Sequence, residues 1–173
     1  MQLSGKRVVE VVGEGFQDQE ATVPLDFLRK EGAEVVTIGV EEGEARGLHG
    51  TVMEIQKSFA EVNPADFDAM VIPGGKSPAF LREFPEAVEF IKIFASSGKP
   101  IAAICHGGQL LAAAGLVKGL TMTGYPGIKE EMEKAGANFI DSEVVVDGNF
   151  ITSRLPADLE AFDAKIKEKL LEP

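Results

Sequence analysis

Short apolar runs alternate along the chain with longer segments in which apolar residues recur every three or four positions. The apolar runs predict buried strands at residues 7–12, 33–39, 68–72 and 101–104. The helically spaced segments predict helices at residues 17–30, 85–97, 109–114 and 156–171. Strands that alternate with helices in this way predict an α/β fold, a doubly wound three-layer sandwich with a mostly parallel central sheet.

Three segments depart from this alternation. Residues 41–47 are polar, and we expect a polar loop there. Residues 51–59 alternate between apolar and polar positions, which predicts a strand exposed on one face. Asp147-Gly148-Asn149 separates two apolar runs and predicts a tight β-hairpin.

The first predicted helix contains a proline. Pro24 lacks the N–H that an interior helical position uses, so we expect a kink or a later helix start. The spacing of Val23, Phe27 and Leu28 predicts that these three side chains share the buried face.

Length and composition limit the class of protein. The 173 residues suit one domain, residues 1–173, with a sizeable core. A net charge of −11 argues against nucleic acid and anionic membranes as partners. The N-terminus carries no signal-peptide pattern, and the apolar run at residues 101–117 is too short to span a membrane, so we expect a cytoplasmic protein.

Motifs for cofactors are missing from the sequence. The single cysteine excludes an internal disulfide and a cysteine pair for metal or redox chemistry. The sequence contains no phosphate-binding loop, no metal-ligand cluster and no dinucleotide-binding fingerprint. We therefore expect no cofactor and no metal.

The most informative stretch runs from Lys99 to Leu116, where an apolar strand passes into a helix with Cys105 at the junction. A side chain there lies at the edge of the sheet where α/β folds bind ligands, and over a helix N-terminus that stabilises an anion. We expect a nucleophile elbow in which Cys105 has a lowered pKa and acts as a thiolate. The alternative is a small buried hydrophobic residue without chemistry.

A carboxyl group is expected near this sulfur. The loops after Val12, Ile72 and Ile104 can meet at one edge of the sheet, which brings Glu20 toward Cys105. Repulsion between two negative charges would raise the pKa of Glu20 until it stays protonated and able to donate to sulfur or to move a proton. The alternative is a solvated glutamate at a helix N-terminus.

Backbone groups at the same edge are candidates for an oxyanion hole. Gly74 and Gly75 let the chain turn its amides inward, and the N–H groups of Gly75 and His106 would stabilise a negative oxygen. A plain turn is the alternative. Adjacent residues on such a turn do not naturally face each other, so we expect the His106 ring to shuttle protons to substrate or to face a neighbouring subunit.

Three further polar side chains are candidates for a role at the site or in the structure. Tyr125, the sole tyrosine, orients a substrate beside the pocket or packs beneath a turn. His49 lies in a glycine-flanked turn, where we expect a structural or solvated residue. Arg154 is expected to pair with a carboxylate at a helix start.

Five segments, in chain order, resemble the PfpI family of the ThiJ/PfpI superfamily: V-I-P-G-G (71–75), A-I-C-H-G-G-Q (103–109), G-Y-P-G-I-K (124–129), E-V-V-V-D-G-N (143–149) and S-R-L-P-A-D-L (153–159). Members of that family are intracellular cysteine proteases, glyoxalases and protein deglycases. The resemblance implies a flavodoxin-like sandwich and homo-oligomers built from dimers, including hexamers. It also implies Cys105 as nucleophile, His106 as its partner and Glu20 as the carboxyl that approaches the sulfur.

Two positions depart from the family's archaeal proteases. Those proteases place a glutamate just after the P-G-G-x-x-P loop, where it reaches a neighbouring subunit's histidine, and this chain has Ala79 there. They also have an acidic residue where this chain has Gln17. Loss of the acid that orients His106 weakens the case for peptide hydrolysis by a Cys–His–Glu triad.

We therefore expect a stress-type enzyme that acts through Cys105 on reactive carbonyl compounds, glycated protein or peptides. A non-enzymatic redox sensor or chaperone, in which Cys105 is oxidised beside a protonated Glu20, is the alternative. A glutamine amidotransferase would need a histidine downstream of residue 106, and the sequence has none.

Overall fold

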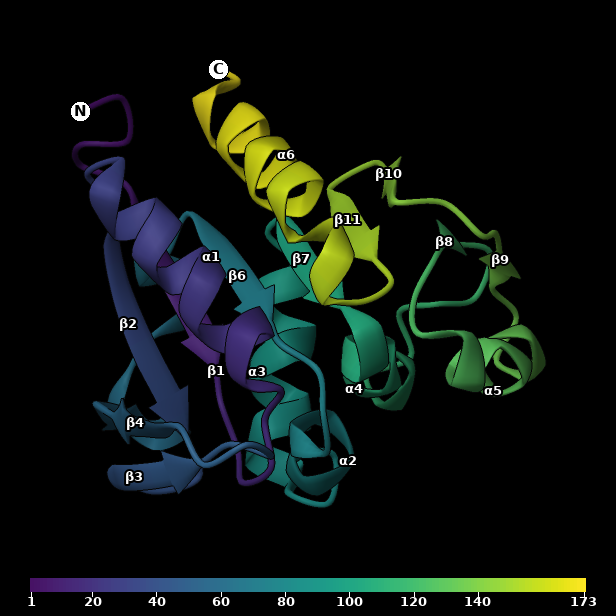
Figure 1. The fold of residues 1–173 in the computed structure, drawn as a ribbon, viewed down its shortest axis with the longest axis horizontal. Helices are drawn as coiled ribbons and strands as arrows, with labels where there is room; N and C mark the ends of the chain where they lie inside the picture. The colour runs from purple at the N-terminus through teal and green to yellow at the C-terminus, as the bar shows by residue number, and fades with distance from the viewer.

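Seven strands form one mostly parallel sheet in the computed structural model, which describes residues 1–173 (Figure 1). Their order across the sheet is β10-β11-β7-β6-β1-β2-β5, and β10 is the strand that runs antiparallel to its neighbour. The strands are β1 (Arg7–Val11), β2 (Glu34–Gly39), β5 (Lys57–Ser58), β6 (Ala69–Ile72), β7 (Ile101–Ile104), β10 (Val144–Asp147) and β11 (Phe150–Ser153). The predicted α/β sandwich with a mostly parallel central sheet is confirmed.

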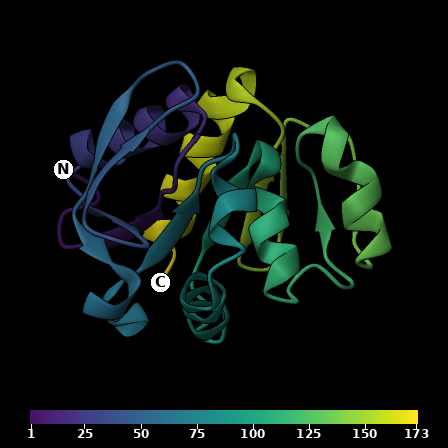
Figure 2. The same ribbon diagram turned by 90° about the horizontal axis from the view of Figure 1, so that it is seen from below.

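Helices cover both faces of this sheet. The helices are α1 (Asp18–Lys30), α2 (Ser77–Leu81), α3 (Pro85–Ala95), α4 (Gly108–Ala113), α5 (Lys129–Lys134) and α6 (Leu159–Leu171). Figure 2 shows α1 in purple and α6 in yellow on one side of the sheet, with the teal α3 on the other. One core lies under α1 and α6 around Leu28 and Phe162, and a second lies under α3 and α4 around Ile91 and Leu111.

The central strands are apolar on both faces because both faces are covered. In β1, Val8 faces the α1–α6 core and Val9 faces the α3–α4 core. In β7, Ala102 and Ile101 divide in the same way between the two cores. This double burial fixes the strand ends from which the loops at the carboxyl edge of the sheet emerge.

The polar segment at residues 41–47 is not a loop. It contains β3 (Gly43–Arg46), which pairs antiparallel with β4 (Val52–Ile55) in a separate sheet. The prediction of a single strand over residues 51–59 was also wrong, because β4 and β5 belong to different sheets. Alternate side chains of this hairpin, including Ala45 and Met53, are buried against the α1–α6 core, so a polar sequence needs only a few apolar positions to form it.

Two smaller elements complete the chain. β8 (Thr121–Met122) and β9 (Asn138–Phe139) form a short parallel pair beside α5 (Figure 1). The hairpin predicted at Asp147-Gly148-Asn149 is confirmed, with Asp147 opposite Phe150 across β10 and β11.

No helix is both long and apolar enough to cross a membrane.

The helix predicted at residues 17–30 is present as α1. It starts at Asp18 and contains Pro24, so of the two alternatives raised by the proline, a kink or a later start, the later start is wrong. Pro24 removes the hydrogen bond that would reach the carbonyl of Glu20, and burial of the proline ring offsets that loss. The buried face also differs from the prediction, since Leu25 and Leu28 are buried while Val23 is 39% exposed.

Two carboxyl groups lie inside the core under α1 and α6. Both carboxyl oxygens of Glu10, on β1, and one of Asp163, on α6, are buried without a hydrogen-bond partner. Burial raises the pKa of Glu10 well above its usual value, and the nearby carboxylates of Asp26 and Asp163 raise it further, against a lowering by Arg29. Burial also raises the pKa of Asp163 to about 7. Both groups are therefore neutral in the folded protein over much of the acid range.

The raised pKa of Asp163 predicts a loss of stability with rising pH. Between about pH 4, where an unfolded aspartate ionises, and about pH 7, the folded state holds a proton that the unfolded state has released. The free energy of unfolding should fall across this window and should fall less in Asp163→Asn, which should be the more stable protein at pH 8 by roughly 2 kcal/mol. Urea denaturation at a series of pH values measures this.

The control for that experiment is Asp66→Asn, the same substitution at an exposed carboxylate. It should leave the pH dependence of the wild type in place. A wild-type slope retained in Asp163→Asn would contradict the assignment.

Candidate active site

Three loops meet at the carboxyl edge of the central strands, as the sequence predicts. The loop after β1 and the loop after β6 are joined by backbone hydrogen bonds from Gln17 N to Gly74 O (3.0 Å) and from Lys76 N to Gly15 O (2.8 Å). Phe16 and Gly75 form an isolated antiparallel bridge between the same two loops. The turn after β7, which carries Cys105, lies against Gly74. Residues from three distant parts of the chain are thereby brought together.

Cys105 has a strained backbone. Its φ of +62° makes it the one non-glycine residue with a positive φ, a conformation that costs roughly 1–3 kcal/mol. β7 ends at Ile104, and a 3₁₀ turn at Cys105–Gly107 leads directly into α4. The turn lies so close to β6 that a Cβ atom at Gly107 would lie 2.8 Å from the carbonyl oxygen of Ile72. The predicted elbow is present, with the cysteine at its sharpest point.

The sulfur and the neighbouring imidazole face each other. Cys105 Sγ lies 3.2 Å from His106 Nδ1, so the expectation that adjacent residues would not pair here was wrong. The left-handed conformation of Cys105 is what turns the two side chains to the same side. The His106 ring stacks on Tyr125, with ring centroids 4.7 Å apart and an angle of 22° between the planes. Tyr125 is 41% exposed and therefore lies beside the site and does not pack beneath a turn.

Glu20 is held from two directions. Gln17 caps the N-terminus of α1 by accepting a hydrogen bond from the Glu20 backbone N–H (2.8 Å). The Gly74 N–H donates to Glu20 Oε1 (3.0 Å), while Oε2 is buried without a partner. Burial raises the pKa of Glu20 to about 7. The predicted rise is present, but its main cause is burial and not repulsion by a thiolate.

The thiol of Cys105 does not have the lowered pKa that the sequence predicts. Its side chain is only 7% exposed, and burial together with the charge of Glu20 raises its pKa to about 12. The backbone N–H groups of Gly75 and His106 hydrogen-bond to the sulfur and oppose this rise. Because the pKa of Glu20 lies near 7 and that of Cys105 near 12, Glu20 ionises first and the sulfur stays a thiol near neutral pH. A thiolate therefore forms only when a base removes the proton of the thiol.

His106 can accept a proton. Burial lowers its pKa below the usual value, against a rise caused by the charge of Glu131. The ring is therefore neutral at neutral pH and has a free nitrogen for the proton of the thiol or of a substrate. The arrangement supplies a nucleophile, a base and a buried acid at one edge of the sheet.

The other residues singled out in the sequence lie elsewhere. His49 is exposed, and its backbone N–H donates to Asp18 Oδ1 (2.9 Å), which is a structural contact. Arg154 pairs with Asp158 at the start of α6 (2.9 Å), as predicted, and also with Asp141 (2.8 Å). No group of three or more histidine, cysteine, aspartate or glutamate residues is placed to hold a metal ion.

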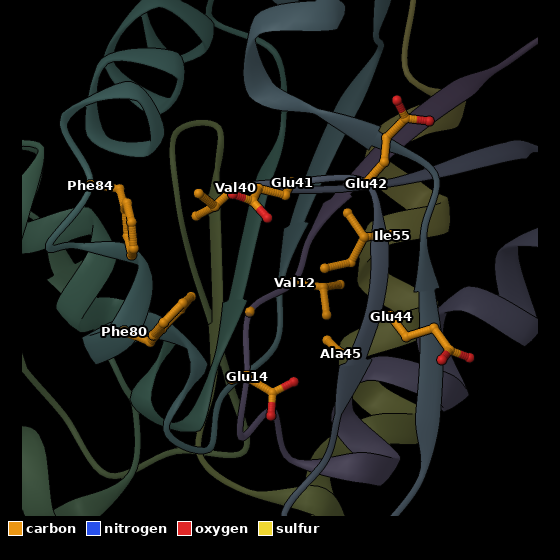
Figure 3. Close-up of a pocket in the computed structure, with 11 residues that line it drawn as sticks. Val12, Glu14, Val40, Glu41, Glu42, Glu44, Ala45, Ile55, Phe80 and Phe84 are labelled. Atoms are coloured by element: carbon orange, nitrogen blue, oxygen red, sulfur yellow. The ribbon is translucent and has the colours of Figure 1, made fainter.

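A separate cleft of about 320 Å³ opens at the same edge of the sheet, between the β3–β4 hairpin and α2 (Figure 3). Its floor is apolar and its rim carries glutamates. The residues that line it are Val12, Gly13, Glu14, Val40, Glu41, Glu42, Glu44, Ala45, Ile55, Phe80 and Phe84. None of the candidate catalytic residues lines this cleft, so its volume gives no measure of the space at Cys105.

One site residue was missed in the sequence. The charge of Glu131, on α5, acts on His106, and its carboxylate is bound by Arg82 (2.8 Å) and Gln109 (3.1 Å). Nothing local marks this glutamate among the four acidic and basic residues around it. Its partners lie 49 and 22 positions away in the chain, which a pattern of neighbouring residues cannot reveal.

Gly74 is predicted to be irreplaceable at this site. A Cβ atom there would lie 2.6 Å from Glu20 Oε1, 2.7 Å from Cys105 Cβ and 2.9 Å from His106 N. Gly74→Ala should therefore separate the two acids, change the rate at which iodoacetamide alkylates Cys105, and lower the free energy of unfolding by about 1–3 kcal/mol. Alkylation kinetics and urea denaturation measure the two effects.

Gly98→Ala is the matched control. Gly98 has a positive φ of 74° and open space around it, so alanine there should cost only the backbone strain of about 1–2 kcal/mol and leave the alkylation rate unchanged. Equal alkylation rates in wild type and Gly74→Ala would contradict the predicted close packing.

Comparison with known proteins gives a consistent result. The sequence pattern of the DJ-1/PfpI family matches residues 6–169. A deglycase of Pyrococcus abyssi is 45% identical over 156 residues, which are 90% of this chain and 94% of the relative. Protein/nucleic acid deglycase 2 of Escherichia coli is 44% identical over 161 residues, 91% of this chain and 94% of the relative.

A solved structure of similar fold supports the same family. The crystal structure of Drosophila melanogaster DJ-1beta superimposes with a TM-score of 0.89 at 30% identity, covering 96% of this chain and 90% of the other. The names of the relatives support an enzyme function. The chain belongs to the DJ-1/PfpI family.

Proposed function

We propose that this protein is a cysteine-dependent deglycase or glyoxalase that acts on reactive carbonyl compounds and on their adducts with protein amines. The observation that carries the proposal is the contact of 3.2 Å between Cys105 Sγ and His106 Nδ1, with the buried Glu20 as the neighbouring acid. The relatives named deglycases support this choice of substrate class.

The proposed reaction begins with transfer of the thiol proton to His106. The sulfur then bonds to the aldehyde carbon of a 2-oxoaldehyde, and the carbonyl oxygen takes a proton, which gives a hemithioacetal. With a glycated amine, the sulfur replaces the amine on the carbon that bears the hydroxyl group, and the amine leaves with the thiol proton. Both substrates therefore converge on the same hemithioacetal.

The second half of the reaction moves two protons and then adds one water. Glu20 or His106 takes the proton from the carbon bonded to sulfur, and the neighbouring carbonyl carbon receives a proton. The hydroxyl on the sulfur-bearing carbon gives up its proton and the former ketone oxygen takes one, which leaves a thioester with a hydroxyl group on the neighbouring carbon. Water hydrolyses the thioester to a 2-hydroxy acid and regenerates the thiol. No oxidant or reductant is consumed in either half of the reaction.

Peptide hydrolysis is less favoured by the residues present. Position 79, where the archaeal proteases of the family have a glutamate, holds an alanine. Nucleic acid is disfavoured as a substrate by the net charge of −11, although the Escherichia coli relative is named for both protein and nucleic acid. Small carbonyl compounds and glycated protein are the proposed substrates, with assembly into homo-oligomers as the resemblance implies.

Redox sensing is a second candidate function, and one observation favours it. The Glu20 carboxyl neighbours the sulfur and its Oε2 is buried without a partner, so a protonated carboxyl there would donate to an oxygen added to the sulfur. Mass spectrometry after mild peroxide treatment tests this. Absence of a doubly oxygenated Cys105 would remove the candidate.

The catalytic proposal predicts a large effect of one substitution. Cys105→Ala should lower the turnover of methylglyoxal to lactate, and the release of amine from a methylglyoxal-treated lysine peptide, by roughly 10²-fold or more. Lactate assay and mass spectrometry of the peptide measure the two reactions. His49→Gln removes the other histidine, which is exposed, and should leave both rates unchanged. Equal rates in Cys105→Ala and wild type would overturn the proposed function.

A further inference from the structure

Besides the sulfur of Cys105, the His106 ring contacts Tyr125, and the segment that begins at Tyr125 continues into α5. Tyr125 stacks on the ring and its backbone N–H donates to the carbonyl of Cys105 (3.0 Å). A 3₁₀ turn at Pro126–Ile128 then leads into α5, where Glu131 lies in the first turn. The same segment therefore supplies the surface that covers the imidazole and a carboxylate.

Glu131 is fixed by hydrogen bonds at both carboxylate oxygens. Gln109 Nε2 donates to Oε1 (3.1 Å), and Arg82 Nη1 donates to Oε2 (2.8 Å). Gln109 follows His106 by three residues across a 3₁₀ turn and the start of α4, so the two side chains share one face. The carboxylate that binds Gln109 is thus held on the His106 side of α4.

The two donors come from the loops that build the site. Arg82 follows α2, the helix that begins just after the Gly74-Gly75 loop. Gln109 lies in α4, the helix that begins just after Cys105 and His106. Through these two hydrogen bonds, Glu131 links the residue that follows α2 to a residue of α4. Each of these helices follows a loop that carries residues of the site.

A protonated His106 ring needs a negatively charged group nearby. Nδ1 faces the sulfur at 3.2 Å, and a ring that accepts the thiol proton becomes a cation. Stacking on Tyr125 restrains the plane of the ring but supplies no full negative charge. Glu131 is the charged group that acts on the imidazole, and its side chain is 42% exposed, so its charge is partly screened by solvent.

We propose that Glu131 is a positioning residue for His106, whose carboxylate, clamped by Arg82 and Gln109, stabilises the imidazolium that forms when His106 takes the proton of Cys105. The inference rests on the proposed function of the Cys105 site. It assigns the acid of the Cys–His pair to α5 of the same chain.

The first test is a titration that requires no enzyme activity. In the His49→Gln background the only imidazole signals in an NMR spectrum belong to His106. Glu131→Gln removes the charge and keeps the size of the side chain, and the midpoint of the His106 titration should move to lower pH. Glu130→Gln is the matched control, because Glu130 is 84% exposed and pairs with Lys134. It should leave the midpoint in place.

Two results of the titration would overturn the inference. One is an unchanged midpoint in Glu131→Gln. The other is an equal shift in Glu131→Gln and Glu130→Gln, which would mean that His106 responds only to the overall charge of the protein.

The second test follows the reaction. Turnover of methylglyoxal by Glu131→Gln should show a kcat lowered roughly tenfold with KM little changed, because the imidazolium forms during the reaction and not on binding. Glu131→Asp should recover part of kcat, and Glu130→Gln should match wild type. A kcat equal to wild type in Glu131→Gln would overturn the inference. Absence of any Cys105-dependent turnover in wild type would overturn the proposed function, and the titration would still decide the inference.

Discussion

The site depends on the positive φ of Cys105. β7 lies between β6 and β11 with both faces covered, so its direction cannot adjust at its end. The chain leaves the sheet after Ile104 and enters α4 through a 3₁₀ turn at Cys105–Gly107, and Cys105 begins that turn at a φ of +62°. The same turn points the sulfur toward His106 Nδ1. A local conformational cost of roughly 1–3 kcal/mol is offset by the packing of the whole sheet.

The second requirement is close contact between loops. Gly74 lies where Glu20, Cys105 and His106 converge, and no side chain fits there. Its N–H binds the Glu20 carboxyl while its carbonyl accepts the Gln17 N–H, so one glycine positions the buried acid from two sides. Because the acid is buried, it keeps a proton up to about pH 7, and burial together with the charge of Glu20 keeps the sulfur a thiol at that pH. Packing, and not a helix dipole, is therefore what sets the ionisation of this site.

The sequence predicts those features that depend on neighbouring residues. The strands β1, β2 and β7 are recognised because their apolar runs are long, and the β10–β11 hairpin because Asp147-Gly148-Asn149 fits a tight turn. The β3–β4 hairpin escapes prediction because only its buried positions are apolar and their partners lie in another part of the core. The Cys105–His106 contact escapes for a similar reason, since a positive φ at a non-glycine residue is imposed by the packing around it. The direction of the Cys105 pKa was wrong because burial outweighs the backbone donors.

Buried acids recur in this chain, and the contrast between them separates structural from functional roles. Glu10 and Asp163 lie under α1 and α6 without hydrogen-bond partners, and both are held neutral by burial. Glu20 is equally buried, but one of its oxygens accepts a hydrogen bond from the Gly74 N–H, and its carboxyl neighbours the thiol of Cys105. Glu131 is the opposite case, a half-buried carboxylate that Arg82 and Gln109 bind. A Cys–His pair between a neutral acid and a charged one can move a proton in either direction, because one neighbour donates to the sulfur while the other stabilises the protonated ring.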